Sequence, residues 1–400
     1  MQFNLVRTTT LRAQPDTNVG MRLLISAGEA SGEMYGAQLL AALRRRVPAI
    51  EAFGVGGGRM RAAGCHTVVD SGDVAVVGIA EVVRHLPRIY RRFHELLRAV
   101  DVNRPDAAVL IDFPDFNFRL ARELHRRGIP VIYYISPQLW AWRSGRIDLV
   151  RRYVRKMLVI FPFEESWYRE RGVDAEFVGH PLCDICVDSL APPADRGAEA
   201  AENEDDGWIA LLPGSRRSEV EMNFPAMAEA MEPLAGKMPG RFVVPIAPTL
   251  DSKWVRDFAL ANSTVPLEFT NDAQAALAGA RAAVVASGTA TVQAAMIGTP
   301  FVMVYRVSPV SWLLGRRLVH VPFFAMVNLI AGHEVVPELV QSHFSAANVT
   351  ARLQEILSDS PSRHRMIEGL ASVREKLCPG GNGQSAPERA SLAVLKAIGS

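Results

Sequence analysis

The sequence predicts an α/β protein made of two doubly wound domains that face each other across a cleft. Short apolar runs alternate with helical patterns from residue 21 onwards, as in parallel sheets covered by helices. With 400 residues and a hydrophobic share of 49%, the chain has enough material for two domain cores. The segment 191–207 is acidic and poor in apolar residues, and it separates the two alternating halves as a linker or surface excursion.

The first half carries the strands and helices of one domain, which we expect to span residues 21–190. Expected strands cover residues 22–26, 51–55, 107–112, 130–135, 157–161 and 175–178. Helical spacing lies between them over 34–46, 79–99 and 116–127. Residues 1–20 contain no apolar signal region and precede the first strand, so we expect an N-terminal arm, which need not be native.

The second half predicts a further domain over residues 208–345, followed by helices over 346–400. Its expected strands are 208–212, 241–246, 282–286 and 301–305, with helices near 217–236 and 288–297, and the chain reads as helical from about 335. Residues 282–305 carry no charge, but Ser-Gly-Thr and Gly-Thr-Pro breakers favour a buried strand, helix and strand over a membrane span.

Composition excludes several classes of protein. Lys and Arg exceed Asp and Glu by only 44 − 42 = 2, which argues against a polycationic nucleic-acid binder. The four cysteines, Cys65, Cys183, Cys186 and Cys378, are too few for a disulfide scaffold, so we expect structural thiols in a reducing cytoplasm. The Cys183-x-x-Cys186 spacing also occurs in redox and zinc sites, but no second close pair follows it.

Nicotinamide and P-loop chemistry are disfavoured. Residues 54–60 are glycine-rich but lack the G-x-G-x-x-G spacing, and the relaxed match at 381–386 follows a helix rather than a strand. No Walker A sequence is present.

The segment 211–219, "LLPGSRRSE", is typical of an anion site between a strand and a helix. Gly214 and Ser215 can present backbone N–H groups at the helix N-terminus, and Arg216 adds a cation that suits a diphosphate. An ordinary helix cap with solvated arginines is the alternative.

A second turn repeats this pattern at Ser287, Gly288 and Thr289, before another predicted helix. Gln293 lies within that helix, near enough to reach a sugar attached to the phosphate, although a surface glutamine is equally compatible with the spacing.

Acidic residues follow two predicted strands of the first half. Asp112 ends a buried strand and can act as a general base, or it can hold the turn by hydrogen bonds. Asn117 follows in the same turn and is a candidate residue for the acceptor side of the cleft, whereas Asp115 could cap the helix that follows. After the first strand, Glu29 and Ser31 lie in a small-residue turn that allows either close approach to a ligand or tight packing.

Two further segments have unusual composition. Residues 136–143, "SPQLWAWR", present Trp140, Trp142 and Arg143, which suit sugar faces and anionic groups unless the tryptophans belong to a core. Helix 79–99 is cationic and amphipathic, which is compatible with membrane contact or with packing on a sheet. Its candidate membrane residues are Val82, Val83, Leu86, Arg88, Ile89, Arg91 and Arg92.

Nine motifs, in this order, resemble those of the lipid-A-disaccharide synthases over about residues 22–390: "GEASGE", "VGIAEVV", "DFPDFN", "SPQLWAWR", "FVGHPL", "LLPGSR", "SEVE", "ASGTAT" and "NLIAG". The resemblance implies a GT-B glycosyltransferase of two Rossmann-like domains, with the nucleotide on the C-terminal one. It implies inverting transfer from UDP-2,3-diacylglucosamine to 2,3-diacylglucosamine 1-phosphate, which gives the β-1′,6-linked disaccharide of lipid A and UDP.

The resemblance also assigns roles to residues. Asp112 becomes the general base and Arg216 the residue that stabilises the leaving diphosphate, while Asn328 lines the donor site. In this family, an arginine and helix dipoles stabilise the leaving diphosphate, a task that a metal ion performs in other glycosyltransferases. The resemblance therefore implies no metal and no other cofactor. The lipid substrates imply a peripheral protein on the cytoplasmic face of the inner membrane, with no nucleic-acid partner. The protein could form an oligomer, and the resemblance does not determine its oligomeric state.

The chain departs from the family pattern at three positions, with Glu33 for Asp, Gln293 for Glu and His333 for Arg. These departures leave donor affinity open. The alternatives are a UDP-N-acetylglucosamine 2-epimerase, another GT-B enzyme, or a non-catalytic lipid- or nucleotide-binding descendant.

Overall fold

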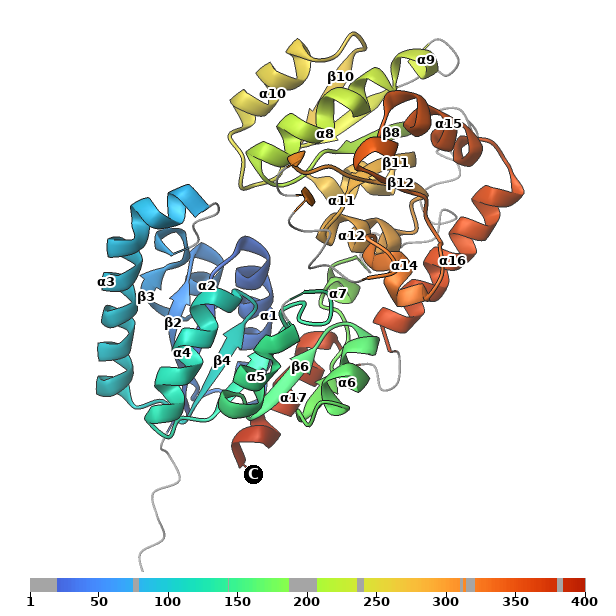
Figure 1. The fold of residues 1–400 in the computed structure, drawn as a ribbon. Helices are drawn as coiled ribbons and strands as arrows, with labels where there is room; N and C mark the ends of the chain where they lie inside the picture. Colours follow the sequence, from blue (N-terminus) through green and yellow to red (C-terminus); the bar gives the residue numbers. More distant parts are fainter. Residues whose placement is uncertain are drawn as a thin grey trace, which may run out of the picture.

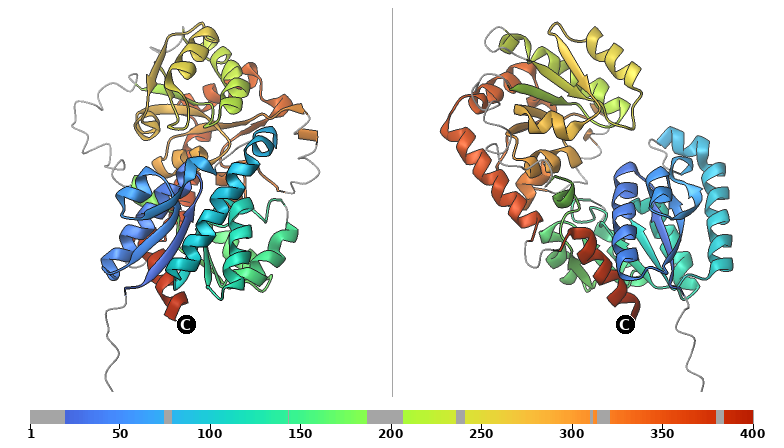
Figure 2. Two further views of the ribbon diagram at one scale, coloured as in Figure 1. Left: turned by 90° about the vertical axis from the view of Figure 1, so that its left-hand side faces the viewer. Right: turned by 180° about the vertical axis from the view of Figure 1, so that it is seen from behind.

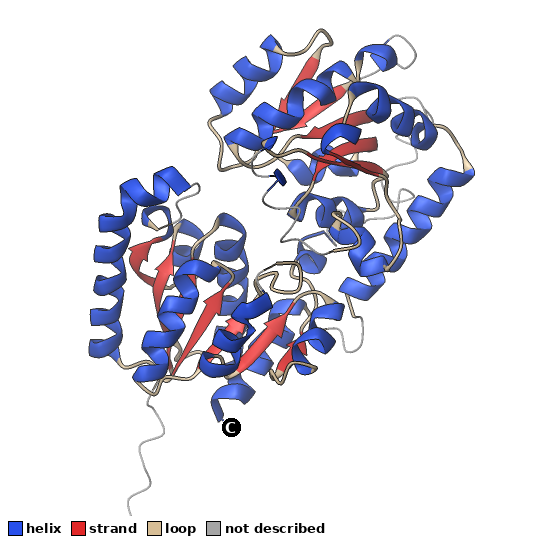
Figure 3. Cartoon of the chain, viewed as in Figure 1, coloured by secondary structure: helices blue, strands red, loops and turns tan. Residues whose placement is uncertain are grey.

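Two parallel sheets form two lobes in the computed structural model of the protein (Figure 1). The structure describes residues 20–74, 79–142, 144–186, 207–235, 241–309, 312–313, 321–379 and 384–399. The N-terminal sheet has seven strands in the order β3-β2-β1-β4-β5-β6-β7, and the C-terminal sheet has six in the order β10-β9-β8-β11-β12-β13. Helices cover the sheets, as Figure 3 shows by colour, which confirms the predicted doubly wound α/β class.

The N-terminal lobe alternates strands and helices in chain order. Its strands are β1 (Arg22–Ala27), β2 (Glu51–Gly56), β3 (His66–Asp70), β4 (Ala107–Ile111), β5 (Val131–Tyr134), β6 (Lys156–Val159) and β7 (Ala175–Phe177). Its helices are α1 (Ala30–Arg46), α2 (Gly58–Ala62), α3 (Ile79–Asn103), α4 (Pro114–Arg126), α5 (Ile147–Tyr153), α6 (Pro162–Arg169) and α7 (Leu182–Cys186). Every residue of β4 and β5 is buried, because helices cover both faces of the central strands.

The C-terminal lobe repeats this plan. Its strands are β8 (Trp208–Leu212), β9 (Phe242–Pro245), β10 (Leu267–Thr270), β11 (Ala280–Ala286), β12 (Phe301–Tyr305) and β13 (Glu338–Val340). Its helices are α8 (Arg217–Glu229), α9 (Glu232–Ala235), α10 (Ser252–Ala261), α11 (Ala273–Ala278), α12 (Thr289–Ile297), α14 (Met326–Ala331), α15 (Ala346–Leu357) and α16 (Pro361–Leu377). The uncharged stretch 282–305 is confirmed as a buried strand, helix and strand.

Three strands differ from the sequence-based expectation. β3, β10 and β13 were not predicted, and the expected helical run from about residue 335 is wrong at β13, which pairs with β12. All three are edge strands. An edge strand is partly exposed and needs no continuous apolar run, so its pattern is weak.

The last helix, α17 (Ala386–Gly399), returns to the N-terminal lobe. It packs on α1, β5 and β6, and the three views in Figures 1 and 2 agree on this position. The guanidinium of Arg389 donates to the Val178 carbonyl at 2.8 Å, which ties the returning helix to the end of the N-terminal sheet.

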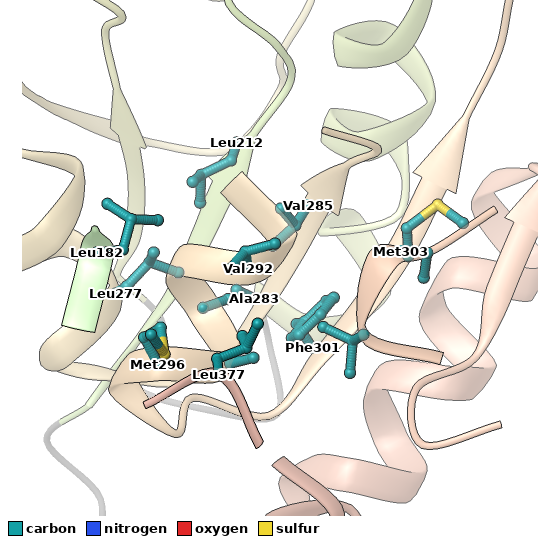
Figure 4. Packing of buried hydrophobic residues seen from close by; sticks show 14 of the residues in the cluster. Leu182, Leu212, Leu277, Ala283, Val285, Val292, Met296, Phe301, Met303 and Leu377 are labelled. Atoms are coloured by element: carbon teal, nitrogen blue, oxygen red, sulfur yellow. The ribbon is translucent and has the colours of Figure 1, made fainter. Parts of the chain in front are cut away.

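Apolar packing joins the lobes where the chain first crosses between them. Leu182 of α7 lies among Leu277, Met296 and Leu377 of the C-terminal lobe (Figure 4). The backbone N–H of His180 donates to the Leu377 carbonyl at 3.0 Å beside this packing. The two crossings of the chain therefore lie next to each other.

A disulfide links these crossings, which corrects the expectation of structural thiols. Cys183 of α7 bonds to Cys378, which follows α16, with a Cα–Cα distance of 5.8 Å. The two cysteines are 195 residues apart, and only the return of the chain brings them together. Cys65 is a buried free thiol, while the side chain of Cys186 lies outside the described part of the structure.

Two predicted segments cannot be compared with the structure. The expected arm over 1–20 and the acidic segment over 191–207 fall almost entirely outside the described residues. Within the described ranges, no helix is both long enough and apolar enough to cross a membrane.

Candidate active site

The two predicted anion-binding turns follow neighbouring strands. β8 ends at Leu212, and the turn through Gly214 and Ser215 leads into α8, which Arg216 precedes as its N-cap residue. β11 pairs with β8 in the sheet, and the turn through Ser287 and Gly288 leads into α12. Gly214 and Gly288 have φ of 135° and 143°, a conformation that glycine adopts readily. The structure thus brings the two turns together, as the sequence predicts.

A carboxylate already occupies the first turn. Glu219 Oε2 accepts the backbone N–H of Ser215 at 2.9 Å and that of Arg216 at 3.3 Å. Its Oε1 pairs with the Arg216 guanidinium at 2.9 Å. Sequence reasoning missed this role of Glu219, although a glutamate three residues after a helix N-cap is the spacing of a capping box. The turn therefore binds an anion in this structure, and that anion is part of the chain.

Two further residues surround the same turn and were not predicted. The Thr249 hydroxyl donates to the Ser215 carbonyl at 2.6 Å. Tyr305, at the end of β12, has a raised pKa because it is buried and because the charge of Glu219 opposes ionisation, while Arg216 acts in the other direction. The hydroxyl of Tyr305, on the neighbouring strand β12, therefore interacts electrostatically with the charged residues of this turn.

The second turn is more open. Gly288 and Thr289 are exposed, and Gln293 is half-buried in the following turn of α12. The hydroxyl of Ser287 donates to the carbonyl of Phe324 at 3.2 Å, which links this turn to the segment before α14.

Asn328 does not lie as the resemblance implies. It is fully buried in α14, and its amide donates to the Val336 carbonyl at 2.9 Å and to Glu338 at 2.8 Å. Its Oδ1 accepts the backbone N–H groups of Val335 and Val336 at 2.8 and 3.0 Å. Because these contacts use both polar atoms of the side chain, Asn328 organises the protein instead of lining a site with a free amide.

Glu338 completes this arrangement. Its carboxylate accepts the backbone N–H groups of Phe324 and Ala325 at 2.8 and 2.9 Å, just before α14. Since Phe324 also receives the Ser287 hydroxyl, Glu338 and Asn328 together support the second turn from behind. His333, the departure noted in the sequence, is exposed after α14.

Asp112 follows β4 in a backbone conformation that is rare for residues other than glycine. Its φ is 43°, and that of Phe113 is 51°. The Asp112 N–H donates to the Tyr134 carbonyl at 3.1 Å. Its carbonyl accepts from the Tyr133 hydroxyl at 2.6 Å and from the Asn117 amide at 2.7 Å. These hydrogen bonds hold a strained turn, and such turns cluster at functional sites.

The environment of Asp112 suits a general base. Burial and, to a smaller extent, the charge of Glu29 raise the pKa of its carboxyl to about 7, although the hydrogen bond from the N–H of Phe113 acts in the opposite direction. Ionisable groups with a pKa near neutrality match the task of accepting a proton at physiological pH.

Asn117 supports Asp112 and does not face an acceptor site as expected. It is buried, and its Oδ1 accepts the Ser26 hydroxyl at 2.7 Å while its amide holds the carbonyls of Ile111 and Asp112. Asp115 does not cap α4, whose N-cap residue is Phe113, but pairs with Arg146 at 2.7 Å.

The turn after β1 lies beside that of Asp112. Glu29 is half-buried and precedes α1 as its N-cap residue, and the half-buried Ser31 lies in the first turn of α1. Glu33 accepts the backbone N–H of Arg59 at 2.6 Å, so the longer side chain of this chain holds the start of α2.

The loop after β5 contains one internal and one exposed tryptophan. Trp140 is half-buried and donates its indole N–H to Glu164 at 3.0 Å, in line with a core role. Trp142 is 40% exposed. Arg143 lies outside the described residues.

The cationic helix α3 has exposed apolar side chains, but several of its arginines form ion pairs within the protein. Leu86 and Tyr90 are 52% and 67% exposed, and Ile89 is half-buried. Arg88 and Arg92 both pair with Asp73, and Arg91 lies 3.9 Å from Glu95. These pairs reduce the positive charge that the sequence predicts for this face. The side chains of Val82 and Val83 are not among those described.

Comparison with solved structures supports the fold. A UDP-N-acetylglucosamine 2-epimerase from Neisseria meningitidis aligns with a TM-score of 0.64 over 94% of this chain and 100% of that one, at 13% identity. MurG from Acinetobacter baumannii aligns with a TM-score of 0.55 over 94% and 99%, at 14% identity. At these identities the likeness concerns the GT-B fold alone.

Sequence comparison is far more specific. A family model described as lipid-A-disaccharide synthetase matches residues 23–386. The lipid-A-disaccharide synthase of Koribacter versatilis is 56% identical over 94% of this chain and 98% of the relative. That of Acidobacterium capsulatum is 48% identical over 90% and 92%. With its motifs, its two-lobed fold and these relatives, the chain belongs to the lipid-A-disaccharide synthase family of GT-B glycosyltransferases.

Proposed function

We propose that the protein joins UDP-2,3-diacylglucosamine to 2,3-diacylglucosamine 1-phosphate, giving the β-1′,6-linked lipid A disaccharide 1-phosphate and UDP. The observation that carries this proposal is the state of Asp112, a carboxyl with a pKa of about 7 in a strained turn at the end of β4. Family membership supplies the substrates, and Asp112 supplies a group able to accept a proton from the acceptor hydroxyl.

The transfer is a single inverting displacement. Asp112 takes the proton of the acceptor 6′-hydroxyl while that oxygen bonds to the anomeric carbon of the donor. The bond from the anomeric carbon to the diphosphate oxygen breaks on the opposite face, and its electron pair leaves with UDP. Arg216 and the N–H groups of the turn at Ser215 stabilise the charge that develops on the diphosphate.

The carboxylate of Glu219 affects how the donor binds at the first turn. Glu219 now accepts the N–H groups that the diphosphate would use, so the donor displaces this carboxylate or shares the turn with it. Gln293 and the start of α12 at Ser287, Gly288 and Thr289 complete the donor side. This arrangement uses a cation and two helix N-termini and operates without a metal ion.

Both substrates carry acyl chains, which places the reaction at a membrane surface. The protein acts as a peripheral enzyme on the cytoplasmic face of the inner membrane. Leu86 and Tyr90 of α3 support this role, because two large apolar side chains four residues apart are exposed on one helix face.

The test is UDP release by the purified protein with both lipids together and with each lipid alone, in the presence of EDTA. Release that requires both lipids and persists in EDTA supports a metal-independent synthase. Release that stops in EDTA and returns with a divalent cation contradicts the metal-independent mechanism. No release from protein that still binds UDP refutes the proposed reaction, and incubation with UDP-N-acetylglucosamine then tests for an epimerase.

A further inference from the structure

Glu164, in the first turn of α6, has a buried carboxyl that accepts hydrogen bonds from the loop after β5. Its Oε1 accepts the hydroxyl of Ser136 at 2.8 Å and the indole N–H of Trp140 at 3.0 Å. Its Oε2 accepts the backbone N–H of Phe161 at 3.2 Å. The residue is only 1% exposed, and burial raises its pKa to about 7 against the effect of these donors.

The loop that Glu164 holds, residues 135–142, starts directly beside Asp112. β5 pairs with β4, and the carbonyl of Tyr134, the last residue of β5, accepts the backbone N–H of Asp112. The next residue, Ile135, has φ of 64°, which is unfavourable for a β-branched side chain. A second strained turn thus lies next to that of Asp112, and it too needs contacts that enforce it.

A series of hydrogen bonds connects Glu164 to the backbone of the loop as far as Trp142. The Tyr168 hydroxyl donates to Ser136 Oγ at 3.2 Å, so that Ser136 both accepts and donates within the network. The backbone N–H of Trp142 donates to the Gln138 carbonyl at 3.2 Å, between the two residues that Glu164 holds. Trp142 follows as the exposed aromatic side chain of the loop.

We propose that Glu164 is a positioning residue for the acceptor, because its carboxylate holds the 135–142 loop, which starts beside Asp112 and carries the exposed indole of Trp142. This inference rests on the proposed function, in which Asp112 meets the acceptor hydroxyl. The exposed indole of Trp142 offers the kind of flat apolar surface on which a sugar ring packs. Glu164 touches neither substrate and acts through the loop.

The chemistry of the network explains why a carboxylate is required. Trp140 and the Phe161 backbone are donors only, and they reach opposite oxygens of Glu164. In Glu164→Gln, whichever way the amide turns, its NH₂ group faces one of these two donors. Trp140→Phe removes one of them, so the glutamine can then accept from Phe161 and donate to Ser136. The defect of Glu164→Gln should therefore be smaller in the Trp140→Phe background.

The experiment measures the KM of acceptor and donor separately, and acceptor Kd by tryptophan fluorescence, for the wild type, E164Q, W140F and E164Q/W140F. The matched control is E165Q, because Glu165 lies on the same helix and pairs with Arg169 at 2.7 Å. We expect acceptor KM and Kd to rise about tenfold in E164Q, as for an unsatisfied buried donor. Donor KM should stay within about twofold, and the double variant should recover part of the loss.

The outcomes separate this inference from the proposed reaction. Unchanged acceptor KM and Kd in an E164Q protein whose melting temperature has fallen would overturn the inference, because Glu164 would then only stabilise the fold. An acceptor Kd that is higher in E164Q/W140F than in E164Q would contradict the explanation by unpaired hydrogen-bond donors. If the wild-type protein binds the acceptor but releases no UDP, the proposed reaction is refuted, and the acceptor Kd of the variants still tests the role of Glu164. Wild-type protein that binds no acceptor would overturn both.

Discussion

The carboxylate of Glu219 accepts the backbone N–H of Ser215 at 2.9 Å, within the turn that the sequence predicts to bind phosphate. The same carboxylate pairs with Arg216, so an internal anion satisfies both the N–H groups and the cation of the turn. A diphosphate that enters the turn is repelled by this negative charge, because Glu219 already occupies the N–H groups and the guanidinium. The affinity for the UDP-sugar then depends on how readily the Glu219 carboxylate leaves these groups.

Replacing Glu219 with Gln should therefore strengthen UDP binding. Removing one like charge at about 4 Å in a solvent-exposed site is worth roughly 1 kcal/mol, which corresponds to about a fivefold lower Kd. Calorimetric titration with UDP measures it. Glu221→Gln is the matched control, because Glu221 lies on the same helix and pairs with Arg217 at 2.9 Å. Equal affinities in both variants would rule out competition between Glu219 and the diphosphate.

Asp112→Asn should reduce kcat by roughly 10²–10⁴-fold, the usual contribution of a positioned base, and leave UDP binding unchanged. The asparagine keeps the shape of the side chain but cannot accept the acceptor proton. Asp115→Asn serves as the control, because Asp115 follows three residues later and its side chain is 71% exposed. Near-normal turnover in Asp112→Asn would remove Asp112 from the base role.

The pH dependence of kcat/KM follows from the raised pKa of Asp112. The base works as a carboxylate, so activity should be full above about pH 7 and fall as the pH drops through that value, by about tenfold per pH unit. Glu29→Gln removes a charge that raises this pKa, and the fall should then move to lower pH.

Glu164 has a pKa in the same range, so the effect of Glu29→Gln identifies the group that titrates. A pH profile that does not move in Glu29→Gln would assign the fall in activity to a group other than Asp112.

Membrane contact through α3 should depend on its exposed apolar side chains more than on its arginines. Arg88 and Arg92 form ion pairs with Asp73, so charge reversal there would break these ion pairs as well as change the charge of the surface. Leu86→Asp combined with Tyr90→Asp should lower binding to vesicles of phosphatidylglycerol and phosphatidylethanolamine by about tenfold or more. Burying a large apolar side chain contributes roughly 1.5–3 kcal/mol to the free energy of binding, and both substitutions remove this contribution. Sedimentation with the vesicles measures this binding.

Val102→Asp provides the comparison, because Val102 is 81% exposed at the opposite end of α3. It should leave vesicle binding unchanged. Equal losses in both variants would mean that α3 contributes only a general apolar surface.

The central parts of both sheets were predictable because their strands are buried on both faces. The run 107–111 is apolar at every position, and such runs at regular intervals with helices between them have few other interpretations. The edge strands were missed for the opposite reason. β10 has no buried residue, so its sequence carries little pattern.

The residues of the candidate site were predictable by type and position, but their contacts were not. The sequence placed Asp112 and Ser215 at strand ends, yet it could not reveal that Asn117 faces inward to the Asp112 carbonyl or that Asn328 is enclosed by backbone groups. Each of these depends on how a side chain turns within a packed interior. Glu219 and Glu164 did leave a signal, since both stand three residues after a helix N-cap.

The return of α17 to the first lobe has a consequence for biosynthesis. The strands β5 and β6 leave the ribosome long before α17 is translated, yet α17 covers one face of them. The N-terminal lobe therefore cannot finish folding until α17 has been synthesised, and the apolar face that α17 covers stays uncovered until then. A nascent chain stalled before Ala386 would expose that face, which makes it a natural target for chaperones during synthesis.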